Sequence, residues 1–263
     1  MDTPGNLLAT EIKIFLDLER DAVFCHGRFE NLFDTYRRHV ARWESLPAEP
    51  LLSKMQALLA ATCLHLSCKP RDQFTAWTLN LNQPVANLFA TGDNQAGTVA
   101  GRLITTGVRT EPENRLFVES RRGAQHSESL LSFSLDEIPA IVEAYYERSE
   151  QTRVRLFAPA EAEFLLVFGL PQVDESWLAS LDASSALRRI EQELTPVEKR
   201  AFRFDCGCNA QRMMDVLRSL FGDKVEALFA GEDQLEVFCP RCGRRWWIAR
   251  EDFAEGAGRV GLS

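Results

Sequence analysis

Apolar residues recur at helical spacing through residues 51–68, where they cover a wide face of a predicted helix. A face of this width is typical of a helix that packs inside a domain. Residues 136–148 show a second pattern of this kind, which predicts another helix. The apolar positions of the first helix are Leu51, Leu52, Met55, Leu58, Leu59 and Leu66, and those of the second are Ile138, Ile141, Val142 and Tyr145.

Short runs with strand character lie between and after these helices, and turn residues such as Gly92, Asp93 and Asn94 separate them. Strands in meander-like order with intervening helices are typical of an α+β domain. The sequence therefore predicts a mixed sheet-and-helix domain that ends near Pro171. The predicted strands cover residues 73–81, 85–91, 99–104, 115–119, 129–133, 154–157 and 164–170.

The pattern changes after Pro171, where residues 173–203 are polar and rich in Ala, Ser and Glu. We interpret this stretch as a helical linker, although two surface helices of the first domain fit the pattern equally well. The predicted parts are an α+β domain (1–172), the linker (173–203) and a small C-terminal module (204–263). Four apolar linker residues are candidates for a surface uncovered on activation, with plain helix packing as the simpler explanation: Trp177, Leu178, Leu181 and Leu187.

The chain has 263 residues, of which 45% are hydrophobic and 26% are charged, and its formal net charge is −8. The negative charge argues against binding to a nucleic-acid backbone as the main task, because clustered Lys and Arg provide that attraction. The N-terminal residues lack a basic segment followed by a continuous apolar run, and no run approaches the length of a membrane span. A cytosolic protein is the expectation, and thiols are kept reduced in that compartment.

Four of the seven cysteines form two close pairs, Cys206-Gly-Cys208 and Cys239-Pro-Arg-Cys242. Zinc binds four thiolates in a tetrahedron, and a C-x-x-C turn supplies two of them. Gly243 stands where a left-handed residue often closes such a turn, and Gly207 lets the first pair turn both side chains toward one point. No histidine competes, since all four lie in the first half of the chain. The sequence therefore predicts one Zn²⁺ bound by Cys206, Cys208, Cys239 and Cys242.

The residues between the two pairs predict a compact module. Asn209 is a candidate cap of a helix that ends at Gly222, a second short helix follows, and strands are predicted at 235–238 and 245–248. Such a module buries little core by itself, so metal binding is expected to supply most of its folding free energy. Oxidation of the thiolates would release the metal and expose apolar surface. The apolar face of the first helix is Met213, Val216, Leu217 and Leu220.

The other three cysteines carry weaker signals. Cys63 and Cys68 belong to the apolar helix or its end, where a small buried thiol is the usual explanation. Cys25 precedes His26, but neighbouring residues rarely point toward each other, so an activated nucleophile is not favoured. No phosphate loop, dinucleotide fingerprint or nucleophile elbow is present, and an enzyme is not expected.

Several segments resemble the heat-shock protein 33 family of cytosolic, redox-regulated holdase chaperones. The segment Phe204-Asp-Cys-Gly-Cys, the helical spacer and Leu235-Glu-Val-Phe-Cys-Pro-Arg-Cys-Gly are similar to the redox-switch module of that family. Tyr145-Tyr-Glu-Arg-Ser-Glu-Gln151 resembles the family's Tyr-x-x-x-Ser-Glu-Gln segment. Gln83-Pro-Val-Ala-Asn-Leu and Thr98-Val-Ala-Gly-Arg102 are fainter matches to its central sheet.

The resemblance implies that Cys206, Cys208, Cys239 and Cys242 bind zinc in the reduced, resting state. On oxidation, disulfides within each pair are implied, Cys206 with Cys208 and Cys239 with Cys242. The linker then loosens, unfolded client polypeptides are bound without ATP, and active members tend to dimerise. The stretch between Pro171 and Cys206 is shorter than the family's linker, so a divergent relative with a purely structural zinc is an alternative.

Two further alternatives use the same C-terminal residues. A zinc ribbon could bind single-stranded nucleic acid through its arginines together with Trp246 and Trp247. However, acidic residues outnumber basic ones from Phe204 onward. A thiol oxidoreductase would use Cys239 and Cys242, but such a motif normally opens a helix, whereas strands are predicted to flank this pair. The redox-regulated chaperone is the preferred interpretation.

Overall fold

The computed structural model describes residues 9–110, 112–222 and 224–255. The ends of the predicted first and third parts, residues 1–8 and 256–263, lie outside the described residues. The strands are β1 (Thr10–Asp17), β2 (Ala22–Arg28), β3 (Gln73–Asn82), β4 (Val85–Asp93), β5 (Thr98–Ile104), β6 (Asn114–Arg122), β7 (Gln125–Phe133), β8 (Val154–Ala160), β9 (Glu163–Gly169), β10 (Pro196–Phe204), β11 (Gln234–Phe238) and β12 (Arg245–Ala249). The helices are α1 (Glu30–Trp43), α2 (Leu51–Ser67), α3 (Ile138–Tyr145), the π-helix η1 (Tyr146–Glu150), α4 (Glu175–Ser180), α5 (Ala183–Gln192), α6 (Ala210–Phe221), α7 (Val225–Phe229) and α8 (Arg250–Glu255).

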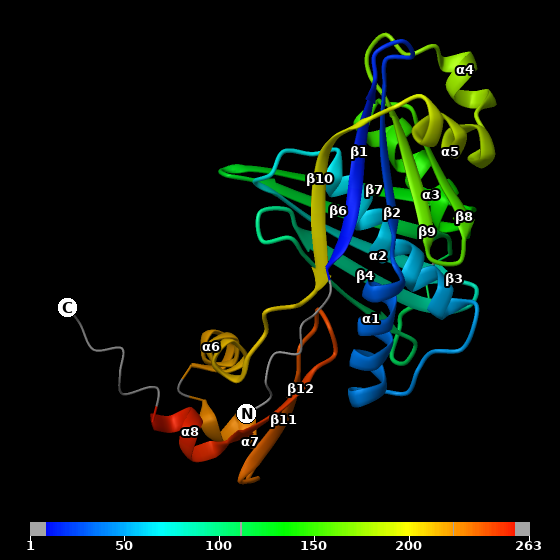
Figure 1. Ribbon diagram of the computed structural model, residues 1–263. Helices are drawn as coiled ribbons and strands as arrows, with labels where there is room; N and C mark the ends of the chain where they lie inside the picture. The colour runs from blue at the N-terminus through cyan, green and yellow to red at the C-terminus, as the bar shows by residue number, and fades with distance from the viewer. Residues whose placement is uncertain (1–8, 111, 223, 256–263) are drawn as a thin grey trace.

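Ten strands form one sheet in the order β7-β6-β3-β4-β5-β10-β1-β2-β9-β8. Neighbouring strands are antiparallel except β10 and β5, which run parallel over two residue pairs. Strand β10 also pairs with β1, so it joins a half-sheet of five strands on one side to four strands on the other (Figure 1). The predicted mixed class of sheet and helix is confirmed.

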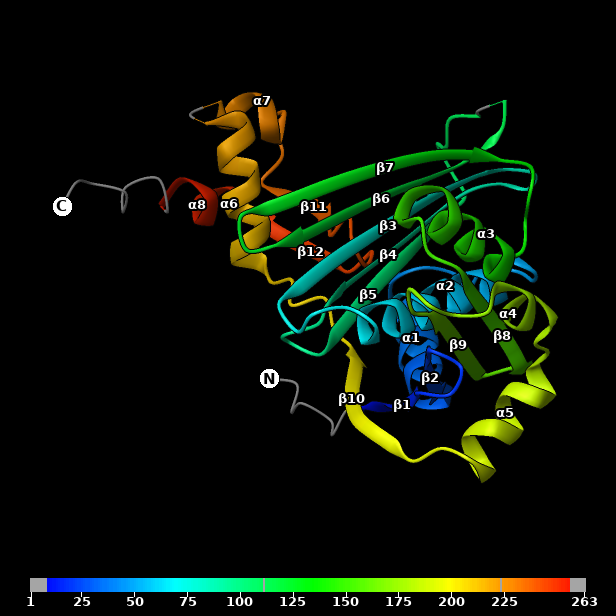
Figure 2. The same ribbon diagram turned by 90° about the horizontal axis from the view of Figure 1, so that it is seen from above.

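Helix α2 lies between the two halves of this curved sheet (Figure 2). Thirteen of its residues are buried, so apolar and small side chains face protein nearly all round. Lys54, one of its buried polar residues, is paired at the edge of the domain: its ammonium donates to the carbonyl of Asp136 at 2.6 Å and lies 2.9 Å from a carboxylate oxygen of Glu137. The prediction of a central helix is confirmed.

Helices α4 and α5 cover the outer face of the half-sheet that contains β1, β2, β8 and β9 (Figure 2). Each begins at an aspartate whose side chain accepts backbone N–H bonds, Asp174 for α4 and Asp182 for α5. Arg189 of α5 donates to the buried carboxylate of Asp17 on β1, with Nη2 3.1 Å from Oδ1. Four apolar linker residues pack on this face: Leu178 and Leu181 are buried, and Trp177 and Leu187 are partly buried.

The structure corrects the reading of residues 173–203 as wholly helical. Residues 196–203 belong to strand β10, because their pairing with β1 and β5 fixes an extended backbone. Their polar composition reflects exposure of most of the strand, and only Phe202 and Phe204 point into the core. Strands β1 and β2 and helix α1 were also not predicted. The division into three parts at 172 and 203 stays a prediction.

The C-terminal residues form a small module around the hairpin β11–β12, with α6, α7 and α8 against it. Asn209 accepts a bond from the backbone N–H of Arg212 at 2.9 Å, which confirms it as the cap of α6. The buried apolar core of the module consists of Phe229, Ile248 and Phe253. Among the described helices, none combines the length and apolar character needed to cross a bilayer.

His65, inside α2, makes the stability of the sheet domain depend on pH. Its Nδ1 lies 2.6 Å from the hydroxyl of Tyr146, and burial lowers the pKa of His65 to about 3. The unfolded chain has an ordinary pKa near 6.5 at this position. Below that pH the unfolded state takes up a proton that the folded state excludes until about pH 3. We expect the free energy of unfolding to fall by about 1 kcal/mol between pH 7.5 and 5.5 through this residue.

Urea unfolding of the wild type and of His65→Gln at both pH values measures this effect. The variant is expected to be less stable at pH 7.5 but to lose less stability on acidification. Equal losses in the two proteins would contradict the assignment.

Candidate metal centre

The four predicted cysteines lie together where β10 leads into the C-terminal module. Their sulfur atoms all lie within 4.8 Å of one another. The Sγ atoms of Cys206 and Cys239 are 3.6 Å apart, as are those of Cys208 and Cys242. A tetrahedron with zinc–sulfur distances of about 2.3 Å has edges of about 3.8 Å. The four cysteines could therefore hold a metal, and their chemistry and spacing fit one zinc ion.

Two glycine turns aim the thiols at this point. Gly243 has φ +75°, and its N–H donates to the carbonyl of Cys239 at 2.9 Å, which closes the knuckle. A Cβ atom at Gly243 would lie 2.8 Å from Oε1 of Glu44, so space as well as conformation selects glycine. Gly207 has φ +62°, and Asp205 accepts its N–H at 2.9 Å. The predicted left-handed turn at Gly243 is confirmed.

Four thiolates whose sulfur atoms lie within 4.8 Å of one another repel each other, so each ionisation makes the next one harder. A divalent cation removes this conflict because it compensates the negative charges. Cys239 and Cys242 are buried, whereas Cys206 and Cys208 are partly exposed.

The turn that contains Cys239 and Cys242 contacts helix α1 of the sheet domain. Nε2 of His39 lies 2.8 Å from the carbonyl oxygen of Cys242. Burial lowers the pKa of His39, so the neutral ring donates this bond from its Nε2–H. The His39 ring also packs against Phe204 with 5.2 Å between centroids. His39, which is 203 positions from Cys242 in the sequence, thereby holds the turn from Cys239 to Cys242 in place.

A second contact joins the hairpin of the module to β5. The guanidinium of Arg102 lies 4.7 Å from the ring centroid of Phe238, and its Nη2 lies 2.6 Å from Oε1 of Glu44. Arg244 stacks over Trp246 at 4.3 Å and lies 5.9 Å from the ring of Trp43. Arginine side chains near the knuckle are therefore engaged within the protein.

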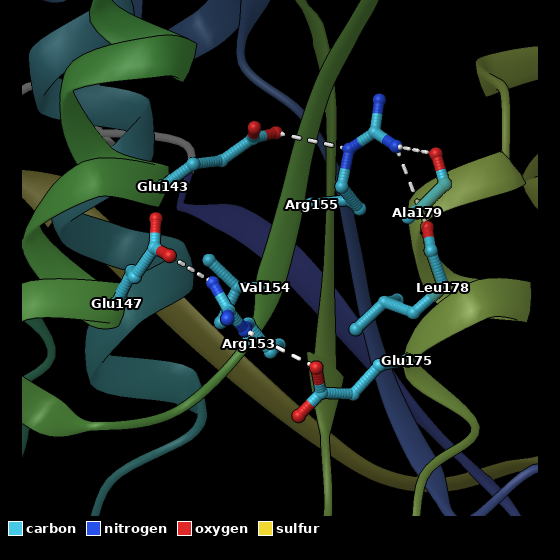
Figure 3. A pocket seen from close by; sticks show the side chains of 8 residues that line it. All are labelled: Glu143, Glu147, Arg153, Val154, Arg155, Glu175, Leu178 and Ala179. Carbon is cyan, nitrogen blue, oxygen red and sulfur yellow. Dashed lines mark hydrogen bonds and ion pairs between the residues drawn. The ribbon is translucent and has the colours of Figure 1, made fainter.

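A hollow of about 390 Å³ lies away from the cysteine cluster, between η1, β8 and α4 (Figure 3). Arg153 pairs with Glu147 and lies 3.7 Å from Glu175, and Arg155 donates to the carbonyl of Ala179 at 2.6 Å. Both arginines thus bind groups of the protein itself. The contacts attach α4 to β8 and η1, and we treat this hollow as part of the linker interface.

The structure separates Cys25 from its sequence neighbour His26. Adjacent strand residues face opposite sides, so the Cys25 thiol lies in the core while Nε2 of His26 is 2.8 Å from Glu163. Cys63 is buried inside α2. Sequence reasoning missed the supporting residues His39, Glu44 and Arg102, because they come from elements far from the cysteines and have no local spacing signal.

Comparison with known proteins gives one consistent family. A family model described as "Hsp33 protein" matches residues 166–249. Proteins named 33 kDa chaperonin from Shigella flexneri and Escherichia coli are each 27% identical over 146 residues, covering 46% of this chain and 50% of the relative. The chain thus matches about half the length of these relatives.

A solved structure has the same fold. The crystal structure of the 33 kDa chaperonin (heat shock protein 33 homolog) from Thermotoga maritima matches with a TM-score of 0.71. The match covers 94% of this chain and 97% of that one at 16% identity. The likeness extends over the sheet domain, the linker helices and the C-terminal module.

Proposed function

We propose that this chain, whose sequence matches and whose fold support membership of the Hsp33 family, is an ATP-independent holdase chaperone. In this proposal, oxidation of the four thiolates releases zinc and switches the protein to a form that binds unfolded polypeptides. The observation that carries the proposal is the gathering of Cys206, Cys208, Cys239 and Cys242 within 4.8 Å. Bound zinc would link the two ligand turns and compensate the thiolate charge.

The small core of the module supports a switch that depends on the metal. Among the described residues of the module, the buried apolar core is confined to Phe229, Ile248 and Phe253, whereas helix α6 has no buried residue. Val216 and Leu220 on α6 are 54% and 73% exposed. Burial of so few side chains cannot order this many residues, so the ligand bonds must contribute strongly.

The linker helices cover an apolar surface that suits unfolded clients. Phe15, Phe24, Leu165 and Val167 lie on the half-sheet beneath α4 and α5. We propose that loss of the zinc module loosens β10 and the linker, and that this face then becomes accessible. Trp177, Leu178, Leu181 and Leu187 would be uncovered at the same time, because they form the other side of the contact.

The remaining features of the proposal follow the family. The oxidised pairs are Cys206 with Cys208 and Cys239 with Cys242, and the active form is a homodimer in the cytosol. No catalytic residue is assigned, since the activity is binding. The working parts are residues 1–172, 173–203 and 204–263.

The nucleic-acid alternative receives no support from the arginines of the module. Arg245 pairs with Glu236 at 3.0 Å, Arg250 pairs with Glu226, and Arg244 stacks on Trp246. A relative with purely structural zinc has the same geometry, so the oxidation experiment must separate it from the switch.

The proposal is tested by treating the reduced, zinc-loaded protein with hydrogen peroxide during mild heating. We expect release of one zinc ion per chain, measured with a chromogenic chelator, and suppressed aggregation of a chemically denatured client. Release of zinc without gain of this activity would contradict the switch and favour structural zinc.

Cys63→Ala is the matched control, because it removes a buried thiol far from the metal centre and should behave as the wild type. Peptide mapping of the oxidised protein tests the pairing. Links within each pair are expected, and links between Cys206 and Cys239 would contradict it.

A further inference from the structure

Two cysteines outside the metal centre lie in direct contact inside the sheet domain. The Sγ atom of Cys25, on β2, is 3.3 Å from the Sγ atom of Cys68, the residue that follows α2. This distance is shorter than the 3.6 Å separations within the metal cluster. The residues are 43 positions apart in sequence, so the fold alone brings them together.

The two thiols differ in access. Cys25 is fully buried in the main core, with Ile14 and Leu166 opposite it on the neighbouring strands. Cys68 is partly exposed and lies at the end of α2, where the regular helical backbone stops. A small oxidant therefore reaches Cys68 first, and Cys25 is the neighbour that can react with the oxidised sulfur.

The surroundings provide positive charge beside the pair. Nη1 of Arg200, on β10, donates to the carbonyls of Leu66 and Lys69 at 2.8 and 2.7 Å, so the guanidinium spans the turn that contains Cys68. The Lys69 ammonium lies 2.7 Å from Glu150. The thiolate is the form of a cysteine that attacks peroxide. Glu198 and Glu150 oppose part of this charge.

Cys25 and Cys63 are both fully buried, and the pKa of each thiol is raised for a different reason. The hydrogen bond with Cys68, together with burial, raises the pKa of Cys25, and Arg200 partly offsets this rise. The pKa of Cys63 is raised by burial alone. Cys63 is therefore a matched buried thiol for comparison.

From this geometry we infer that Cys25 and Cys68 form a second peroxide-sensitive dithiol, which closes to a disulfide inside the folded sheet domain independently of the zinc centre. A disulfide has an S–S bond of about 2.05 Å, so the sulfur atoms must approach by roughly 1.2 Å. Because Cys68 ends a helix, its side chain has more freedom for this movement than a residue inside α2. The bond would tie β2 to the end of the central helix.

The chemistry balances with one molecule of hydrogen peroxide. The Cys68 thiolate attacks one peroxide oxygen, an S–O bond forms, the O–O bond breaks, and the hydroxide that leaves becomes water on protonation. The Cys25 sulfur then attacks the sulfur of Cys68, the S–S bond forms and the S–O bond breaks. The thiol proton of Cys25 leaves with the second hydroxide as water. Two thiols lose two electrons, and one peroxide is reduced to two waters.

The test uses the full chain and mapping of non-reduced peptides after peroxide treatment without heating. We expect a linked pair of peptides that contains Cys25 and Cys68, and a loss of two free thiols beyond those of the metal ligands. Cys68→Ser should abolish the link and leave zinc content unchanged. Cys63→Ala should retain the link. Two results would overturn the inference: Cys68 oxidised to sulfinic acid with Cys25 still a free thiol, or both thiols reduced after complete oxidation of the metal ligands.

Independence from the metal centre is tested with Cys206→Ser, in which the cluster is incomplete. We expect this variant still to form the Cys25–Cys68 link, and absence of the link would contradict independence. The thermal unfolding midpoint of the sheet domain should rise on oxidation in the wild type but not in Cys68→Ser. Failure of the chaperone switch would leave these results unchanged, so the two proposals can fail separately.

Discussion

Replacing Cys239 by serine is expected to remove stoichiometric zinc and to unfold the C-terminal module, while the strands packed around α2 stay folded. Cys239 is buried and would supply one thiolate to the metal. Its backbone N–H also donates to the carbonyl of Arg244 at 2.8 Å, which closes the turn. Structural zinc contributes about 10–16 kcal/mol in zinc-finger peptides. Three buried apolar side chains contribute roughly 1.5–3 kcal/mol each. The metal is therefore the larger of the two contributions.

Elemental analysis and hydrogen exchange of individual peptides measure this outcome. Peptides from α6 and β11–β12 should exchange at unfolded rates in Cys239→Ser, whereas peptides from α2 should keep wild-type protection. Cys63→Ala should match the wild type in zinc content and in protection of the module. Retention of zinc by the serine variant, or a protected hairpin without zinc, would refute the role given to the metal.

Replacing Arg189 by methionine is expected to detach α5 from the sheet without any oxidant. The Arg189 side chain is 13% exposed, and the carboxylate of Asp17 that it binds is 2% exposed. Burial raises the pKa of Asp17, but the hydrogen bonds and charge of Arg189 together with the backbone N–H groups of Arg20 and Glu19 outweigh this effect, and the net pKa is lowered. Removing one partner of a buried ion pair costs about 3–5 kcal/mol, because the other charge is left unpaired.

Limited proteolysis and binding of an apolar dye to the reduced protein measure the effect. Arg189→Met should be cut faster within residues 173–195 and should bind more dye than the wild type. Arg188→Met is the matched control, because its side chain is exposed on the same helix. Equal behaviour of the two variants would show that the Asp17 pair does not hold the linker.

Local patterns were sufficient for the elements that have strong periodicity and for the cluster of four cysteines that could hold a metal. The apolar spacing of α2 and the glycine turns at the two cysteine pairs are properties of neighbouring residues, and the structure bears them out. Strand β10 has no such pattern, since most of its residues are exposed and its conformation comes from pairing with strands early in the chain. Long-range pairing overrides weak local preference in strands.

The supporting contacts of the site were beyond sequence reasoning for the same reason. His39 and Cys242 are 203 positions apart, and Cys25 and Cys68 are 43 apart. The Cys-His dipeptide at 25 and 26 gives no sign of the residue that Cys25 contacts. The thiol of Cys25 faces Cys68 across the core, and only the relation between β2 and α2 makes that contact visible.

The central position of β10 has a consequence for how the chain is made. Strands β1 and β5 each have one partner, β2 and β4, before residue 196 has been synthesised. During translation, both therefore present open hydrogen-bonding edges, which invite pairing with other chains. Emergence of β10 from the ribosome covers most of the edge of β1 and the first two residues of the edge of β5. A protein proposed to guard other polypeptides against aggregation thus carries the same hazard in its own nascent form until this one strand is in place.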